Sequence, residues 1–225
     1  MLIDSFAGVT VQPVESMSGL GSISTTDVEN EGSITNGRSK HLTLFGPGAE
    51  IFAPGTEAHH LYQVEFGTVR ICSLLGDGRR TVSAFHFAGE VFGFELDGHH
   101  RFRAEAIDSV GLRTIAMPGR PAMAAALLRI ALERLMQAQE HLLVVGRQTA
   151  VERVAGFLLD VASRGRQRDL INLPMSHSDI ADYLGLTPET VCRVFKHLRD
   201  SGIVSYTSSR RVTVNRIDGL QEFMG

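Results

Sequence analysis

The chain has 225 residues, enough for one large domain or two ordinary ones, and its 43% hydrophobic and 21% charged residues are typical of a folded globular protein. It has no apolar run near the roughly 20 residues that cross a bilayer, and no basic start followed by an apolar stretch, so we expect neither a membrane span nor a secretory signal. Its 2 cysteines, without a CxxC pair, exclude a disulfide framework and a cysteine-held zinc or iron–sulfur cluster. These features predict a cytoplasmic location.

The net charge of −3 is not spread evenly along the chain. Between Arg166 and Arg216, eight arginines and lysines stand against five acidic residues, a local surplus of three. A basic C-terminal segment suits contact with phosphates.

Residues 1–41 are rich in Ser, Thr, Gly and acidic residues and show no hydrophobic periodicity. Such a composition cannot bury enough apolar surface to fold by itself. We therefore expect 1–41 to be a disordered tail without a specific function.

From Leu42 to about Met117, short apolar runs alternate with glycine turns. Asp77-Gly78, between two runs of strand-forming residues, is a strong hairpin signal. Cys72 lies in one of these runs, where we expect a small buried hydrophobe. Many short strands at regular spacing predict an antiparallel sandwich or jelly roll over residues 42–118.

Residues 119–147 have the pattern of a single helix of about 25 residues, roughly 38 Å long at 1.5 Å per residue. Its apolar residues recur at alternating steps of three and four, as in a coiled coil. We favour a seam that pairs with a second copy of the chain, although a helix packed only on its own β domain is the alternative. The predicted seam residues are Leu128, Ala131, Leu135, Ala138, Leu142 and Val145.

The last region, 148–225, begins with an amphipathic helix whose apolar face includes Val154, Leu158 and Ala162. The pattern then changes to a short strand, a helix, a tight turn, a second helix and two β-rich runs around a Ser-Ser-Arg-Arg turn. This order predicts a winged helix-turn-helix that binds DNA.

Local signals fix the two helices of this motif. Ser176 is a candidate N-cap that forms a capping box with Asp179. Gly185 permits the positive φ of the turn, and Thr187 and Pro188 suit the N-cap and first position of the next helix. Each position meets an independent geometric demand, so chance agreement is improbable.

The exposed face of the second helix carries Glu189, Cys192, Arg193 and Lys196, spaced at i, i+3, i+4 and i+7. Arginine can donate two hydrogen bonds to guanine, and glutamate can accept one from cytosine. We therefore expect Glu189, Cys192 and Arg193 to contact bases, the alternative being an ordinary i,i+4 ion pair on the surface. Expected phosphate contacts, each with a solvated surface residue as the alternative, are Ser176, His177, Thr187, Lys196, Arg210 and Arg211.

Together, the β domain, the long helix and the winged helix-turn-helix resemble the CRP/FNR family of bacterial transcription regulators, from about Leu42 to the C-terminus. The run E-T-V-C-R, from Glu189 to Arg193, is similar to the E-x-x-S-R motif of the FNR branch, with cysteine in the serine position. Pro188 stands where CRP has an arginine, which favours an FNR-type site, TTGA…TCAA. The resemblance implies an α+β fold: a β jelly roll of cyclic-nucleotide-binding type, a dimerisation helix and a winged helix-turn-helix.

The β domain departs from ligand-binding members of this family. Gly93-Phe94-Glu95 stands in place of the motif that accepts a hydrogen bond from the ribose of cyclic AMP. The Arg-Ser pair that binds its phosphate is missing. His59-His60 and His99-His100 are candidate haem ligands, but adjacent histidines in polar loops are more often solvent-exposed. We expect no cofactor; an effector-dependent regulator with a cyclic nucleotide or other small ligand in the β domain is the alternative.

A member without these ligand sets resembles the FixK group, known from rhizobia and relatives of Bradyrhizobium. The resemblance implies activation of genes for microaerobic or anaerobic respiration, denitrification and nitrogen fixation. It also implies a homodimer that binds a TTGA-N6-TCAA-like palindrome in double-stranded DNA without an effector and contacts RNA polymerase. No membrane partner is expected.

Cys192 lies in the second turn of the recognition helix, where the helix dipole and neighbouring cations favour the thiolate. Oxidation to the sulfinate would place a bulky negative charge against phosphates, so we expect it to inhibit DNA binding. The alternative is that the cysteine replaces serine as a small neutral contact. His197 lies on another face of the helix, so we expect no acid–base partner for Cys192 and no enzyme activity.

Overall fold

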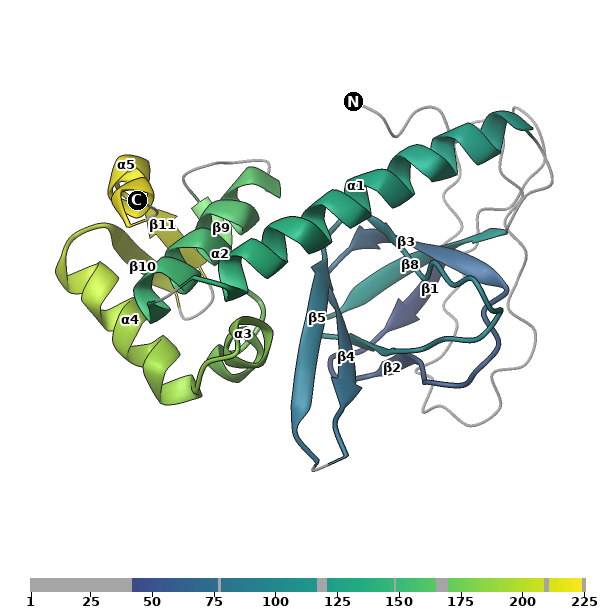
Figure 1. Cartoon of the computed structure of the whole chain (residues 1–225), viewed down its shortest axis with the longest axis horizontal. Coiled ribbons are helices and arrows are strands. Elements are labelled where there is room, and N and C mark those ends of the chain that lie inside the picture. The colour runs from purple at the N-terminus through teal and green to yellow at the C-terminus, as the bar shows by residue number, and fades with distance from the viewer. Residues whose placement is uncertain are drawn as a thin grey trace, which may run out of the picture. The chain divides into compact units, whose positions relative to one another are not determined.

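The computed structural model describes residues 42–76, 78–116, 121–147, 149–164, 170–208 and 211–223 (Figure 1). The predicted disordered tail, 1–41, and Arg210 lie outside these ranges. The chain divides into two compact units. The first unit extends to Ala131 without the segment Leu74–Val82, and the second unit consists of that segment and the chain from Leu132 onward. Within the described ranges, no helix is both long and apolar enough to span a bilayer.

Two four-stranded sheets form the β domain, in the strand orders β1-β8-β3-β6 and β2-β7-β4-β5. The predicted hairpin is confirmed: β4 and β5 are neighbours, and the Leu75 N–H donates to the Arg79 carbonyl (2.8 Å) across the turn. This architecture agrees with the predicted jelly roll. The strands are β1 (Leu42–Phe45), β2 (Glu50–Phe52), β3 (His60–Phe66), β4 (Val69–Leu74), β5 (Arg80–His86), β6 (Val91–Phe92), β7 (Arg103–Ala106) and β8 (Val110–Ala116).

The residues of these segments show why they form strands and turns. Along β7, the buried Ala104 and Ala106 alternate with the half-buried Arg103 and Glu105, as the period of two in a strand requires. Gly67, between β3 and β4, has a φ of +83°, and a Cβ there would lie 2.3 Å from the Ser109 carbonyl oxygen. This turn therefore requires glycine.

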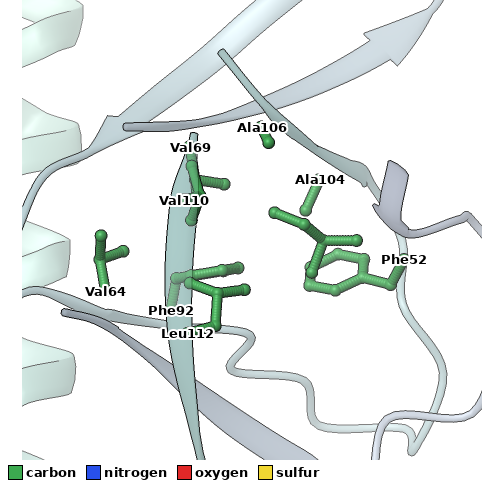
Figure 2. Close-up of a cluster of buried hydrophobic side chains, with 9 residues drawn as sticks. Phe52, Val64, Val69, Phe92, Ala104, Ala106, Val110 and Leu112 are labelled. Carbon is green, nitrogen blue, oxygen red and sulfur yellow. The ribbon is translucent and has the colours of Figure 1, made fainter. Parts of the chain in front are cut away.

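The core of the β domain is a cluster of buried side chains contributed by both sheets (Figure 2). Removing these apolar groups from water is the main force that holds the sheets together. Cys72 is 2% exposed, which confirms the expectation of a small buried hydrophobe. The cluster consists of Ile51, Phe52, Val64, Val69, Phe92, Ala104, Ala106, Val110 and Leu112.

Rings pack together on one side of this core. The ring centroid of Phe92 lies 6.0 Å from that of Phe52 and 5.4 Å from that of Tyr62. His100 stacks on Phe52 with centroids 3.6 Å apart and is only 2% exposed. The expectation that the His99-His100 pair is exposed was therefore wrong for His100, because its flat imidazole stacks on the phenyl ring, while His99 is exposed.

The predicted long helix is α1 (Pro121–Val145), with 25 residues. It begins with proline at its first position, where the missing N–H costs no hydrogen bond. Good helix formers such as alanine, leucine, glutamate and arginine then continue it to Gly146, whose N–H donates to the Leu142 carbonyl (2.9 Å).

One side of α1 is apolar and exposed in the single chain. At the predicted seam positions, Leu128, Leu135 and Leu142 are 62%, 54% and 70% exposed. Exposed leucines in such a row form a surface that a partner is expected to cover. Ala138 is also exposed and Ala131 and Val145 are half-buried, whereas Leu132, Met136 and Leu143 extend the exposed apolar side beyond the prediction.

The second unit contains the predicted winged helix-turn-helix. Its sheet has the order β10-β11-β9, and α2 packs against α4 and α5. On α2, Val154, Leu158 and Ala162 are buried as expected. The short helix α5 was not predicted, because six residues carry too little periodicity to be recognised. The elements are α2 (Ala150–Arg164), β9 (Leu170–Asn172), α3 (His177–Leu184), α4 (Pro188–Asp200), β10 (Val204–Ser208), β11 (Arg211–Val214) and α5 (Ile217–Glu222).

Candidate nucleic-acid interface

A complete capping box begins α3. Ser176 Oγ accepts from the Asp179 N–H (3.1 Å), and Asp179 Oδ2 accepts from the Ser176 N–H (3.0 Å). Two backbone N–H groups at the helix start are thereby satisfied. The predicted capping box is therefore present, and it fixes the direction in which the chain enters the helix-turn-helix.

The acidic side chains of α3 are held by an arginine that the sequence did not reveal. Arg80, in the segment Leu74–Val82 of the same compact unit, donates from Nη2 to Asp179 Oδ1 (2.7 Å) and from Nε to Asp182 Oδ2 (2.8 Å). Asp179 is 4% exposed, and a carboxylate so buried needs charged or hydrogen-bonding partners. Arg80 therefore neutralises the two carboxylates of α3.

The turn between the helices has the geometry that its residues predict. Gly185 has a φ of +64° and a ψ of 40°, the left-handed conformation that favours glycine, and its N–H donates to the Ala181 carbonyl. Thr187 caps α4 by accepting from the Thr190 N–H (3.3 Å), and Pro188 occupies the first position. These contacts fix where α3 ends and where α4 begins.

The two faces of α4 differ sharply. The side chains of Val191, Val194, Phe195 and Leu198 are buried and anchor the helix. On the other side, the predicted DNA-contact residues are all exposed and are available for a ligand: Glu189, Cys192, Arg193 and Lys196. We call these four residues the recognition face.

Within the recognition face, Glu189 and Arg193 do not hold each other as an ion pair. Arg193 Nη2 donates to Thr190 Oγ1 (3.4 Å). The Glu189 backbone N–H, the Thr187 side chain and the charge of Arg193 lower the pKa of Glu189, so its carboxylate is ionised at neutral pH. The guanidinium and the carboxylate are both exposed and are not paired with each other, so each can also contact groups outside the chain.

His177 takes a position that the sequence did not predict. Its Nδ1 lies 2.9 Å from Cys192 Sγ, and its ring stacks on Phe195, with centroids 5.0 Å and planes 14° apart. Burial lowers the pKa of His177, so the imidazole is neutral at neutral pH. The expectation that no histidine lies in position to pair with Cys192 was wrong, because these two side chains are in contact. The first turn of α3 faces α4 across the turn, which spacing along one helix does not reveal.

The surroundings of Cys192 include the wing as well as α3. Burial, with a smaller contribution from Cys192, raises the pKa of Tyr206 on β10, while the charge of Arg199 opposes this shift. His197 instead packs edge-on against Phe223 (6.2 Å between centroids), so its predicted location on another face is confirmed. Tyr206 and Arg199 are neighbours of the recognition face that sequence reasoning missed.

The predicted phosphate-contact residues lie around this face. Ser176, Thr187, Lys196 and Arg211 are exposed, whereas His177 is half-buried. Arg210 lies outside the described residues. Among the residues that the structure describes, no group of three or more His, Cys, Asp and Glu side chains is arranged to hold a metal ion.

Comparisons with known proteins agree with this geometry. The family model of the Crp-like helix-turn-helix domain matches residues 152–223, and that of the cyclic nucleotide-binding domain matches residues 42–116. The chain is 42% identical over 198 residues to the nitrogen fixation regulation protein FixK of Rhizobium meliloti, which covers 87% of this chain and 92% of that protein. The chain belongs to the FixK group of the CRP/FNR family.

Other members of the FixK group and the wider family show the same relation. FixK of Azorhizobium caulinodans is 44% identical over 181 residues, covering 75% of this chain and 73% of that protein. The solved structure of FixK2 from Bradyrhizobium japonicum is 36% identical, with a TM-score of 0.78, and covers 83% of this chain and 98% of that chain. CRP/FNR proteins are transcription regulators that bind DNA as dimers, so the expectation that this chain is not an enzyme is confirmed.

Proposed function

We propose that this chain is a homodimeric activator of genes for nitrogen fixation, denitrification and microaerobic or anaerobic respiration. The observation that carries the proposal is the recognition face, which is exposed on a helix whose opposite side is buried. The FixK relatives are named as regulators of nitrogen fixation. In this proposal, residues 42–118 are a sensor-like domain, 119–147 pair the protomers and 148–225 bind DNA.

The recognition face reads a TTGA-N6-TCAA-like palindrome in double-stranded DNA. Arg193 donates to the guanine, Glu189 accepts from the cytosine of the same or the neighbouring pair, and Cys192 contacts a base edge such as a thymine methyl. Phosphate contacts fix the register of the protein on the duplex. The candidates for these contacts are the exposed Ser176, Thr187, Lys196 and Arg211, together with Arg210 and His177. Two recognition helices related by a two-fold axis enter major grooves about 10 bp apart, which matches the spacing of the half-sites.

The exposed side of α1 forms the dimer interface. Its seam residues, leucines alternating with alanines and a final valine, recur at the steps of three and four that bring two helices together along one seam. Exposed leucines are unfavourable in water, and a second α1 would bury them. The two DNA-binding units are thereby joined in one molecule.

The activator needs no small-molecule effector. The rings of Phe52, Tyr62 and Phe92 pack against one another inside the β domain, and His100 is stacked beside them. This packing supports a filled interior in place of a ligand site. The match to the cyclic nucleotide-binding model keeps an effector-dependent regulator as the second candidate.

Oxidation of Cys192 switches DNA binding off. The thiol is exposed on the recognition face, where an oxidant can reach it. A sulfinate there would be larger than the thiol and would repel phosphates. RNA polymerase is the further proposed partner, contacted through the β domain or the DNA-binding unit, since activation requires such a contact.

Fluorescence anisotropy with reduced full-length protein and a TTGA-N6-TCAA duplex, at one stated salt concentration, tests this function. We expect tight binding without added ligand, weaker binding when the spacer is N4 or N8, and loss of binding after peroxide in the wild type but not in Cys192→Ala. Binding that appears only after addition of a cyclic nucleotide would favour the second candidate. Peroxide sensitivity that survives in Cys192→Ala would refute the role of this cysteine.

A further inference from the structure

The structure places a thiol and an imidazole together at the centre of the proposed DNA-binding surface. His177 Nδ1 and Cys192 Sγ are 2.9 Å apart, within the reach of a nucleophile and its base. They come from different helices, α3 and α4, whose ends are fixed by caps. The stack of His177 on Phe195 holds the ring in this orientation.

From this geometry we infer that His177 is the acid–base partner of Cys192 and makes this thiol the preferred site of peroxide attack. The inference deepens the proposed function, because it rests on Cys192 being the site at which oxidation acts. His177 thereby gains a role besides the phosphate contact predicted from the sequence. In this role it is a positioning and proton-accepting residue for the modification of Cys192.

The protonation states of the pair favour this reaction. Because burial keeps His177 neutral, one ring nitrogen carries a hydrogen and the other accepts one. The thiol is a donor, so Nδ1 accepts from it and the N–H of the ring lies at Nε2. The same tautomer leaves Nε2 as a hydrogen-bond donor, the form that a phosphate contact requires.

The charged and titratable groups around the pair come from three elements. On α3, Asp179 is held by Ser176 and Arg80. On α4, Arg193 donates to Thr190 and Arg199 donates to Asp200 (3.1 Å). On β10, Tyr206 is the titratable neighbour of Cys192. His177 is therefore the group in contact with the sulfur that can exchange a proton near neutral pH.

The reaction uses hydrogen peroxide as the oxidant. The thiol proton moves to Nδ1 while the sulfur attacks one peroxide oxygen, so that an S–O bond forms and the O–O bond breaks. The departing hydroxide takes the proton from the imidazolium and leaves as water. Sulfur loses two electrons and the peroxide gains them, giving the sulfenic acid. A second peroxide converts this to the sulfinic acid and a second water. The sulfinic acid then passes its proton to Nδ1, and the resulting sulfinate accepts a hydrogen bond from Nδ1–H.

The rate of this first step tests the inference. Full-length reduced protein is treated with peroxide between pH 5.5 and 9, the sulfenic acid is trapped with dimedone, and the Cys192 peptide is quantified by mass spectrometry. His177→Phe keeps a ring that can stack on Phe195, and His177→Gln keeps a polar group. The matched control is His197→Gln, which changes an exposed histidine on α4, the helix of Cys192, but on another face. The buried Cys72 is an internal control for unfolding.

We expect both His177 variants to lower the rate at pH 7 by about 10-fold or more, as loss of an acid–base catalyst does, and His197→Gln to leave it unchanged. The difference from wild type should shrink as the pH rises, because hydroxide can then remove the thiol proton in place of the imidazole. It should also shrink at acidic pH, where His177 already carries a proton. A structural role for His177 would instead lower the rate equally at every pH.

Equal rates in the wild type and both variants, or a ratio that does not change with pH, would overturn the inference. The proposed function is tested separately by anisotropy on the same samples. If the rates follow the prediction but the sulfinate form still binds the palindrome, the proposed redox control of DNA binding is refuted. The inference that His177 is the acid–base partner of Cys192 is then still supported. If peroxide abolishes binding equally fast in all variants, only the role of His177 fails.

Discussion

The β domain and the helix-turn-helix each hold a histidine against a phenylalanine ring, but they surround it differently. His100 stacks on Phe52 inside the β domain and is 2% exposed. His177 stacks on Phe195 but is only half-buried and lies beside the exposed Cys192. Enclosure makes the first histidine part of the core, whereas partial exposure lets the second exchange a proton with a thiol. The same residue type thus acquires a packing role or a chemical role from its degree of burial.

The comparison extends to the residues around each histidine. Near His100, Phe52, Tyr62 and Phe92 pack ring on ring in the interior. Near His177, the charged and polar groups of Glu189 and Arg193 point away from the protein. The first region stabilises the fold, and the second interacts with a partner. Substitutions should therefore affect stability in one region and DNA binding in the other.

The largest effect is expected in the interior of the β domain. Phe92→Ala removes a ring that is 2% exposed and should lower the free energy of unfolding by about 3–5 kcal/mol. Phe102→Ala, at a ring that is 42% exposed, is the matched control and should change it by less than about 0.5 kcal/mol. Chemical denaturation followed by circular dichroism measures both, and equal losses would show that the interior rings are not the core.

The next largest effect is expected at the recognition face. Arg193→Ala should weaken binding to the palindrome by about 1–3 kcal/mol for each half-site, roughly 5- to 150-fold in the dissociation constant per half-site, because each protomer loses two hydrogen bonds to guanine. The midpoint of unfolding should stay unchanged, since this side chain is exposed. Arg101→Ala, an exposed arginine of the β domain, is the control and should leave the affinity as it was. Anisotropy titration distinguishes these outcomes.

A smaller change is expected from a residue that binds the phosphate backbone. Lys196→Ala should weaken binding to specific and non-specific duplexes by similar factors. It should also lower the slope of log K against log salt by about 0.9 for each phosphate that the variant no longer neutralises. Anisotropy at several salt concentrations gives the slope. Weakening confined to the specific duplex would show instead that Lys196 reads bases.

The smallest effect concerns pH. Burial lowers the pKa of His100, although the charge of Glu95 opposes this shift. The unfolded chain therefore binds a proton more readily, and the free energy of unfolding should fall as pH decreases below about 6.5. His100→Phe should reduce this dependence, because phenylalanine stacks on Phe52 but does not titrate. His99→Gln, at the exposed neighbour, should leave it unchanged, and an opposite result in denaturation between pH 7.5 and 5.5 would contradict the account.

Much of the DNA-binding unit was predictable from the sequence, because its signals are local. The capping box of Ser176 and Asp179, the left-handed Gly185 and the cap at Thr187 each depend on residues within a few positions. Helical spacing alone also predicted that Glu189, Cys192 and Arg193 share an exposed face. That residues 42–118 form a jelly roll and residues 119–147 a long helix was also predictable, because the spacing of apolar residues and glycines is a local signal.

What the sequence did not reveal depends on contacts between distant segments. His177 and Cys192 are 15 positions apart, and Arg80 meets Asp179 across 99 positions. Spacing along one helix cannot reveal such pairs, which follow from the crossing of α3 and α4 and from the place of the hairpin segment. His100 was misjudged because a polar residue in a glycine-rich loop is usually exposed, and only the tertiary fold shows the ring of Phe52 beneath it.

Base-pair discrimination by Arg193 tests the central claim most directly, namely that the recognition face reads DNA. The measurement is competition anisotropy with reduced full-length protein, no added ligand, and duplexes in which the G of each TTGA half-site is replaced by A. The wild type should discriminate by about 1–3 kcal/mol for each half-site, and Arg193→Ala should bind both duplexes nearly equally. Full discrimination by Arg193→Ala would show that this arginine does not read the guanine and would contradict the account.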